Sequence, residues 1–326
     1  MMADIPGGLV RPTLFLIVLL AGCSSNTGPS ASSTLLYVAN QTSSAVTAYA
    51  RDANGDVTPS VTIAGASTGM DQPYGVARDA TGRLYVTTFN PPGVRVFAAG
   101  VNGNVAPIRV ITGSNTHLGQ AIGLAFDATG RLHVSNGGSD TVTIYAAGAT
   151  GNVAPVAMIA GSDTRLSGPF GIAFDATGRF YVANVLSNRI TIYAENASGN
   201  MAPVDTIVGA STQLNGPVGL AFDAGGRLYV SNTNGTSPNH RITVYSAGAS
   251  GDATPIAIIM GANTGLDGPY GMVVDQAGKL YVASSAFGSH QYKVTVYAAG
   301  ANGNVAPTAT IAGPTTGLSG PVFLSF

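Results

Sequence analysis

The stretch that decides the fold is Gly171-Ile-Ala-Phe-Asp-Ala-Thr-Gly-Arg-Phe-Tyr-Val-Ala-Asn184. Nearly the same residues recur at 123–136 and at 219–232, each 48 residues away. Two apolar runs flank an Asp-Ala-Thr-Gly segment, in which Asp favours the opening of a tight turn and Gly accepts a positive φ. The stretch therefore predicts a β-hairpin that is repeated along the chain.

Working outward, the Tyr-Val part of this hairpin occurs six times, at steps of 48 or 52 residues, beginning at Tyr37, Tyr85, His133, Tyr181, Tyr229 and Tyr281. A second signature, apolar-x-apolar-aromatic, ends at Tyr49, Phe97, Tyr145, Tyr193, Tyr245 and Tyr297. A fixed period of this length indicates a repeat architecture.

Each unit is predicted to hold four short strands, which in the quoted unit are 170–175, 179–184, 190–193 and 204–208. We name these strands a to d in chain order. They are apolar at both parities, so both faces of each sheet should be buried, as in a propeller blade packed between neighbours. A solenoid is the competing arrangement, but it needs polar caps at its ends, and the sequence has no such caps.

The two ends of the chain predict how the ring closes. The repeats begin with a strand b at Leu35–Asn40 and end with a lone strand a at 321–326. Six complete blades result only if Val322–Phe326 pairs with Leu35–Asn40 as the innermost strand of the first blade, which removes two exposed sheet edges. The prediction is an all-β, six-bladed β-propeller over residues 35–326.

The residues before the repeats read as a targeting signal. Leu14–Leu20 is apolar but too short to span a bilayer, and it leads into Leu20-Ala21-Gly22-Cys23. This resembles the lipobox of bacterial lipoproteins, which implies a signal peptide over 1–22, lipid attachment at Cys23 and a flexible tether over 23–34. The resemblance implies a lipid-anchored protein of the bacterial cell envelope, at the outer membrane if the host is diderm. Cys23 is the only cysteine, so an intramolecular disulfide is excluded.

Composition limits the classes of partner. The chain of 326 residues has a formal net charge of −1, and only 9% of its residues are charged. A nucleic-acid binder would carry a basic stripe, so we expect no nucleic acid. With 45% apolar residues the chain can bury a large core.

The repeated motif, Gly-Pro-x-Gly-(Ile/Leu)-Ala-Phe-Asp-x-x-Gly-Arg-Leu-Tyr-Val-(Ala/Ser)-Asn followed by Ile-Thr-(Ile/Val)-Tyr, resembles the NHL-repeat β-propellers over about residues 35–326. The resemblance implies the fold strongly and the function weakly, because that family includes binding platforms for protein and RNA, a lyase, and relatives with lactone-hydrolase activity.

The titratable residues give little sign of catalysis. The recurring acids Asp79, Asp127, Asp175, Asp223 and Asp275 fall in the a–b turns, where a turn carboxylate that bonds its own backbone explains them better than a metal belt does. His133 takes the place of a packed tyrosine. His240 and His290 lie in longer b–c loops without an obvious fixed carboxylate, so we expect no metal site, no catalytic residues and no cofactor.

A binding site is expected instead at the end of the channel where the d–a and b–c connections meet. The residue inside each Pro-x-Gly opens an inner strand, and around the ring it reads Tyr74, Ile122, Phe170, Val218, Tyr270 and Val322. The aromatic members, Tyr74, Phe170 and Tyr270, would form an apolar floor. The polar rim would come from residues that end the b strands, Asn40, Thr88, Asn136, Asn184, Asn232 and Ser284, with a wall made by Asn239, His240, Phe287, His290 and Tyr292.

We therefore favour a binding or scaffold module over an enzyme, with an uncharged glycan, peptide or protein as its ligand. The alternative is a lactonase-like or streptogramin-lyase-like enzyme that uses a metal at the same face.

Overall fold

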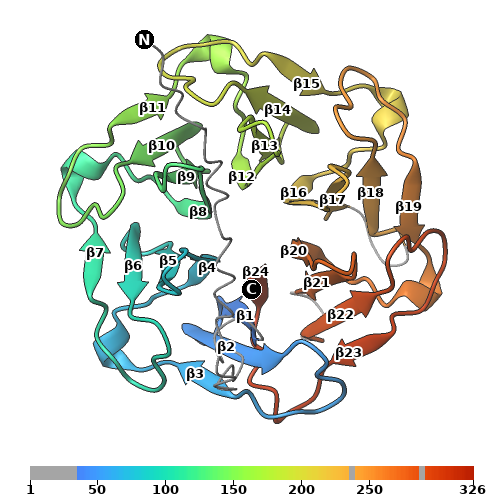
Figure 1. Ribbon diagram of the computed structural model, residues 1–326, viewed down its shortest axis with the longest axis horizontal. Helices are drawn as coiled ribbons and strands as arrows, with labels where there is room; N and C mark the ends of the chain where they lie inside the picture. The colour runs from blue at the N-terminus through green and yellow to red at the C-terminus, as the bar shows by residue number, and fades with distance from the viewer. Residues whose placement is uncertain (1–34, 235–238, 286–290) are drawn as a thin grey trace, which may run out of the picture. The chain divides into compact units, whose positions relative to one another are not determined.

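The structure, a computed structural model, describes residues 35–234, 239–285 and 291–326. In this part of the chain, six four-stranded antiparallel sheets stand in a ring around a central axis (Figure 1), and we use the word channel for the region that the innermost strands surround. The predicted six-bladed β-propeller is confirmed. No helix in the described residues is long and apolar enough to cross a bilayer.

The innermost strands (a) are β24 (Pro321–Ser325), β4 (Pro73–Arg78), β8 (Ala121–Phe126), β12 (Pro169–Phe174), β16 (Pro217–Phe222) and β20 (Pro269–Val274). Next to them (b) are β1 (Leu35–Asn40), β5 (Leu84–Thr88), β9 (Leu132–Asn136), β13 (Phe180–Asn184), β17 (Leu228–Asn232) and β21 (Leu280–Ser284). The third strands (c) are β2 (Ala45–Ala50), β6 (Gly93–Phe97), β10 (Thr141–Tyr145), β14 (Arg189–Tyr193), β18 (Arg241–Tyr245) and β22 (Lys293–Tyr297).

The outer strands (d) are β3 (Val61–Ile63), β7 (Arg109–Ile111), β11 (Ala157–Ile159), β15 (Asp205–Ile207), β19 (Ala257–Met260) and β23 (Ala309–Ile311). Short 3-10 helices in the d–a connections are η2 (Ala66–Thr68), η3 (Ser114–Thr116), η4 (Ser162–Thr164), η5 (Ala210–Thr212) and η6 (Ala262–Thr264). Blade 1 is the sheet β24-β1-β2-β3, and blades 2 to 6 follow in chain order. In blade 4 every strand boundary lies within one residue of its predicted place.

Ring closure occurs as predicted. β24 pairs with β1 in antiparallel register, with Val38 opposite Leu324 and Asn40 opposite Pro321. Figure 1 shows the last strand, in red, lying beside the first strand, in blue. The C-terminal strand therefore completes blade 1 from the channel side.

Neighbouring blades approach each other most closely along the inner strands. At Gly171 an added Cβ would lie only 2.3 Å from the carbonyl oxygen of Val218 in the next blade, and four other inner strands have glycine at the same place. Blade 1 alone has a side chain there, because Phe323 follows Val322 where the other units read Gly. Five glycines thus bring the inner strands together, and one phenylalanine enters the channel.

At the outer edge, each c–d connection holds the preceding blade. The Gly103 amide donates to the carbonyl of Thr62 at 2.7 Å, and the Asn104 side chain accepts from the Ser67 amide at 2.8 Å. The same bond closes the ring, from the Gly55 amide to the Thr310 carbonyl at 2.7 Å. These bonds cover the outer strand edges, which would otherwise be free to pair with another chain.

Candidate functional site

The candidate site is the mouth, by which we mean the channel end where the d–a and b–c connections meet and the innermost strands begin. Each innermost strand starts there with its Pro-x-Gly segment or a variant of it. The side chain at x therefore lies at the channel end on this face, and alternate blades contribute an aromatic ring.

Three of the predicted residues come together in the channel. The Tyr74 and Phe170 ring centroids are 6.2 Å apart with the rings edge to face, and those of Phe170 and Tyr270 are 5.9 Å apart. Phe323 stacks on Phe170 at 5.8 Å with an angle of 24° between the rings. We call Tyr74, Phe170, Tyr270 and Phe323 the aromatic floor.

The floor joins blades that lie apart in the ring. Phe170 is the second residue of β12 in blade 4. Phe323 belongs to β24 of blade 1, and Figure 1 shows these two strands on opposite sides of the channel. Contact across the channel is at the spacing that aromatic pairs favour, roughly 4.5–7 Å between centroids. These contacts bring together the side chains of four blades at one point.

Aromatic and aliphatic residues alternate around the ring at the position x of Pro-x-Gly, and the exposure of their side chains differs accordingly. Tyr74, Phe170 and Tyr270 remain partly exposed, while the aliphatic members Ile122 and Val218 are 6% and 2% exposed. The three aromatic side chains therefore keep some exposure at the mouth, whereas these two aliphatic side chains are buried.

The hydroxyl groups of the floor stay protonated. Burial raises the pKa of Tyr270 to about 12, and burial also raises the pKa of Tyr74. The Tyr74 hydroxyl accepts a hydrogen bond from the Gln41 amide nitrogen at 2.8 Å. The floor is an uncharged surface with a few polar groups at its margin, as small-molecule sites tend to be.

Sequence reasoning missed two members of this site. Phe323 breaks the Pro-x-Gly pattern, and this departure was the available signal. Phe89, which directly follows β5 in blade 2, lies 5.4 Å from Tyr74 by ring centroids. Phe89 lies in the same blade as Tyr74, and the pairing of Pro73 with Thr88 places it beside Tyr74, so the register of the a–b hairpin was the signal that could have indicated it.

The predicted asparagines are placed differently from the expectation. Asn184 is 0% exposed; its amide donates to the Val182 carbonyl and to Thr191 Oγ1, both at 3.0 Å, and accepts from the Ser167 amide at 2.9 Å. Asn136 and Asn232 make the corresponding bonds in their own blades. These amides do not form a solvent-facing rim, because they hold strands b and c and the d–a connection together.

His240 also has a structural partner. Its Nδ1 accepts from the Gly268 amide at 3.2 Å, where Asp140 and Asn188 accept from the matching glycines of their neighbours at 2.7 Å. The imidazole is 3.8 Å from the Asp267 carboxylate. His240, Asp140 and Asn188 thus accept the same hydrogen bond, from the glycine amide that precedes the innermost strand of the next blade. His290 and Phe287, the other candidates from this wall, lie outside the described residues, and no group of three His, Cys, Asp or Glu that could hold a metal occurs within them.

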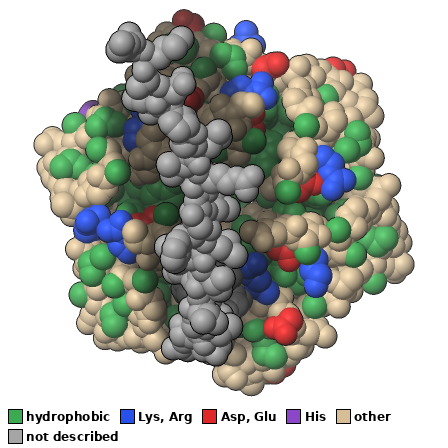
Figure 2. Space-filling model, viewed as in Figure 1, with side chains coloured by type: hydrophobic (Ala, Val, Ile, Leu, Met, Phe, Trp, Pro, Cys, Tyr) green, Lys and Arg blue, Asp and Glu red, His purple; other side chains and the backbone are tan. Residues whose placement is uncertain are grey.

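The acidic turn residues bond locally, as predicted for a turn. Asp175 Oδ1 accepts from the backbone of Thr177 and Arg179, and its other oxygen pairs with the Arg179 guanidinium at 2.8 Å. Burial opposes ionisation, but the bonds from Thr177 and Arg179 prevail and lower the pKa of Asp175. Basic and acidic side chains lie next to one another at several places around the ring in Figure 2. His133 is 0% exposed and reaches Asp127 at 3.3 Å, where Tyr181 reaches Asp175 at 3.3 Å.

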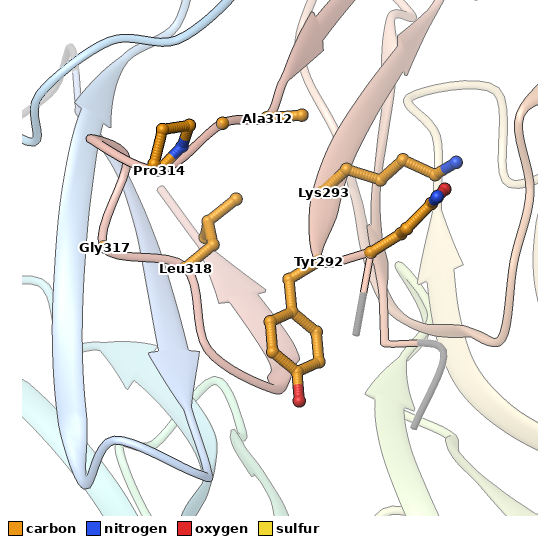
Figure 3. Close-up of a pocket in the computed structure, with 8 residues that line it drawn as sticks. Tyr292, Lys293, Ala312, Pro314, Gly317 and Leu318 are labelled. Carbon is orange, nitrogen blue, oxygen red and sulfur yellow. The ribbon is translucent and has the colours of Figure 1, made fainter. Parts of the chain in front are cut away.

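A hollow on the same face lies between blades 6 and 1 and has a volume of about 430 Å³. Figure 3 shows Leu318 pointing into it, while the Lys293 ammonium group points away from Pro314. Its other labelled lining residues are small or apolar, apart from Tyr292. This hollow offers less aromatic surface than the floor does.

Fold and site together define a six-bladed propeller with an aromatic floor at the channel mouth. The chain belongs to the family described as Lactonase, 7-bladed beta-propeller, whose model matches residues 30–317. Its six blades depart from the seven in that description. The NHL-repeat resemblance and the lipobox remain predictions from the sequence.

Solved structures share the fold. A Bacteroides caccae protein of unknown function has a TM-score of 0.62 at 11% identity, over 89% of this chain and 97% of that one. A chain of a nidogen/laminin complex gives 0.60 at 16% identity, over 89% and 97%. A putative 6-phosphogluconolactonase from Bacteroides uniformis gives 0.58 at 17% identity, over 91% and 86%. No curated protein matches the sequence.

Proposed function

We propose that this protein is a binding propeller whose mouth takes an uncharged, ring-shaped ligand, a sugar or a sugar-derived lactone. The observation that carries the proposal is the meeting of Tyr74, Phe170 and Tyr270 in the channel, at centroid distances of 6.2 and 5.9 Å. The faces of partly exposed aromatic rings suit the C–H faces of a sugar, and protonated phenols add hydrogen bonds without charge.

The proposal includes a membrane anchor. Leu20-Ala21-Gly22-Cys23 supports lipid attachment at Cys23, and residues 24–34 are long enough to serve as a short tether. Acyl chains would then hold the propeller at an envelope membrane. These residues lie outside the described part of the chain.

Binding is tested with the full chain purified in detergent and titrated calorimetrically with neutral monosaccharides and sugar lactones. Phe170→Ala removes the ring on which the other three floor residues converge, and we expect it to weaken binding at least tenfold. Val156→Ala is the matched control, because Val156 is 59% exposed at the outer edge of blade 3. Equal affinity of Phe170→Ala and wild type, with both proteins folded, would contradict the proposal.

Lactone hydrolysis is the second candidate, and the family match together with the likeness to a putative 6-phosphogluconolactonase favours it. The reaction adds water across the ring ester, breaks the acyl C–O bond and releases a hydroxy acid and a proton. It needs a titratable group within hydrogen-bond reach of the attacking water.

A pH-stat assay with unphosphorylated and phosphorylated sugar lactones separates the two candidates. The binding proposal predicts that the protein binds a lactone with measurable affinity and that the lactone still hydrolyses only at its spontaneous rate. Turnover that Phe170→Ala abolishes would establish the enzyme instead.

A further inference from the structure

A polar groove lies beside the aromatic floor. It has a volume of about 270 Å³ and is lined by Gln41, Thr42, Ser44, Asp71 and Gln72. The first three follow β1 in blade 1, and the last two precede β4 in blade 2. All five side chains carry a hydrogen-bonding group, in contrast to the apolar rings of the floor.

The groove and the floor are joined by a direct bond. Gln41 lines the groove, and its amide nitrogen donates to the Tyr74 hydroxyl at 2.8 Å. Backbone bonds also hold the groove in place. The backbone N–H of Gln41 donates to the Gly320 carbonyl at 2.9 Å, and the backbone N–H of Gln72 donates to Ser44 Oγ at 3.4 Å. A ligand that lies on Tyr74 can therefore extend into a groove whose walls are already in place.

Gln72 adopts a backbone conformation that favours glycine. Its φ is 47°, and the equivalent residues in blades 4, 5 and 6 are Gly168, Gly216 and Gly268, with φ between 58° and 62°. A residue with a side chain in this region costs on the order of 1 kcal/mol or more. The Gln72 side chain is exposed, so burial in the core does not account for its presence there.

We infer that the groove is a second subsite, which binds the sugar unit adjoining the one on the floor in a neutral oligosaccharide. This inference rests on the proposed function. Amide and hydroxyl side chains both donate and accept, and the Asp71 carboxylate accepts from paired hydroxyl groups, which matches the alternating donors and acceptors of a sugar. The volume of about 270 Å³ lies just below the range of small-ligand pockets, roughly 300–1,000 Å³, and so suits a single sugar unit.

The test compares neutral disaccharides with their constituent monosaccharides on the full chain, by calorimetry. Gln72→Gly removes the amide and returns the position to the residue that its backbone favours, so the variant should fold. Gln120→Gly is the matched control: Gln120 has the same backbone position in blade 3, with φ of 56°, and does not line the groove.

We expect wild type and Gln120→Gly to bind one or more disaccharides about tenfold more tightly than the monosaccharide, as one or two good hydrogen bonds would give. Gln72→Gly should bind the monosaccharide normally and lose most of that preference, and Asp71→Asn should lose part of it. A preference that survives Gln72→Gly, or no preference in wild type, would overturn the subsite and leave the floor site standing. Failure of every neutral saccharide to bind, or binding of short peptides alone, would overturn the proposed function and the subsite together.

Discussion

Replacement of His133 by tyrosine should remove a pH dependence of stability that this histidine introduces in blade 3. His133 is 0% exposed and is packed edge to face between Phe174 and Phe180, with ring centroids 4.9 and 5.1 Å away. Burial lowers the pKa of His133 to about 4, although its bond to Asp127 works in the opposite direction. The native imidazole therefore stays neutral where a histidine in the unfolded chain takes up a proton.

The sign and size follow from proton linkage. Between the unfolded value of 6.5 and the folded value of about 4, the unfolded state binds more protons, so stability falls as pH falls through this window. Each pH unit costs about 1.4 kcal/mol, which gives about 2 kcal/mol between pH 6.5 and pH 5. Asp127 contributes in a separate window: its pKa is lowered, so the stability that it adds is lost only below its ordinary value of 3.8.

Urea unfolding at pH 7.5 and pH 5.0, followed by tyrosine fluorescence because the chain has no tryptophan, measures the effect. We expect His133→Tyr to lose about 2 kcal/mol less than wild type on acidification, since its hydroxyl can reach Asp127 as Tyr181 reaches Asp175. The reciprocal variant Tyr181→His should lose more stability than wild type between pH 7.5 and pH 5.0. Parallel pH profiles for wild type and His133→Tyr would refute the reasoning.

Three further predictions concern closure, packing and anchoring. Deletion of 321–326 exposes an edge of blade 1 and should produce aggregates that the intact chain does not form in size-exclusion chromatography, whereas a monodisperse product would contradict ring closure. Gly171→Ala places a Cβ 2.3 Å from the Val218 carbonyl and should lower stability by about 1–3 kcal/mol, while Gly225→Ala, whose Cβ meets nothing closer than 3.4 Å, should leave the thermal midpoint nearly unchanged. Cys23→Ser should move the protein from the membrane fraction to the soluble fraction, and unchanged partitioning would rule out a lipid anchor at this residue.

The fold could be predicted because its signals are local and repeated. The Asp-x-x-Gly turns, the period near 48 and the phase difference between the two ends each act within one unit or between neighbouring strands. The prediction that 321–326 closes the ring required only a count of the strands. The pairing of β24 with β1 confirms it.

Part of the aromatic floor could be predicted from the sequence, for a physical reason. The three aromatic x residues stand at one position of the repeat, so their meeting in the channel follows from the ring. Phe323 contacts Phe170 across the channel, and a repeat pattern carries no information about pairs of that kind. The departure from glycine at 323 was visible, but its partner was not.

The asparagines were misplaced although a signal was present. Asn40, Asn136 and Asn184 are each followed seven residues later by a threonine, Thr47, Thr143 and Thr191, and in the structure each pair is hydrogen-bonded at 2.9–3.1 Å. Because strands b and c are antiparallel neighbours, this spacing indicates a bond within the blade. A residue at a strand end cannot be assigned to the solvent until its neighbour in the sheet is known.

The most direct test of the central claim is the affinity of the full chain for neutral saccharides and sugar lactones, measured by calorimetry for wild type, Phe170→Ala and Val156→Ala. The account predicts that wild type and Val156→Ala bind a member of this set alike and that Phe170→Ala binds it at least tenfold more weakly. Equal affinities in all three folded proteins, or no binding by wild type, would contradict it.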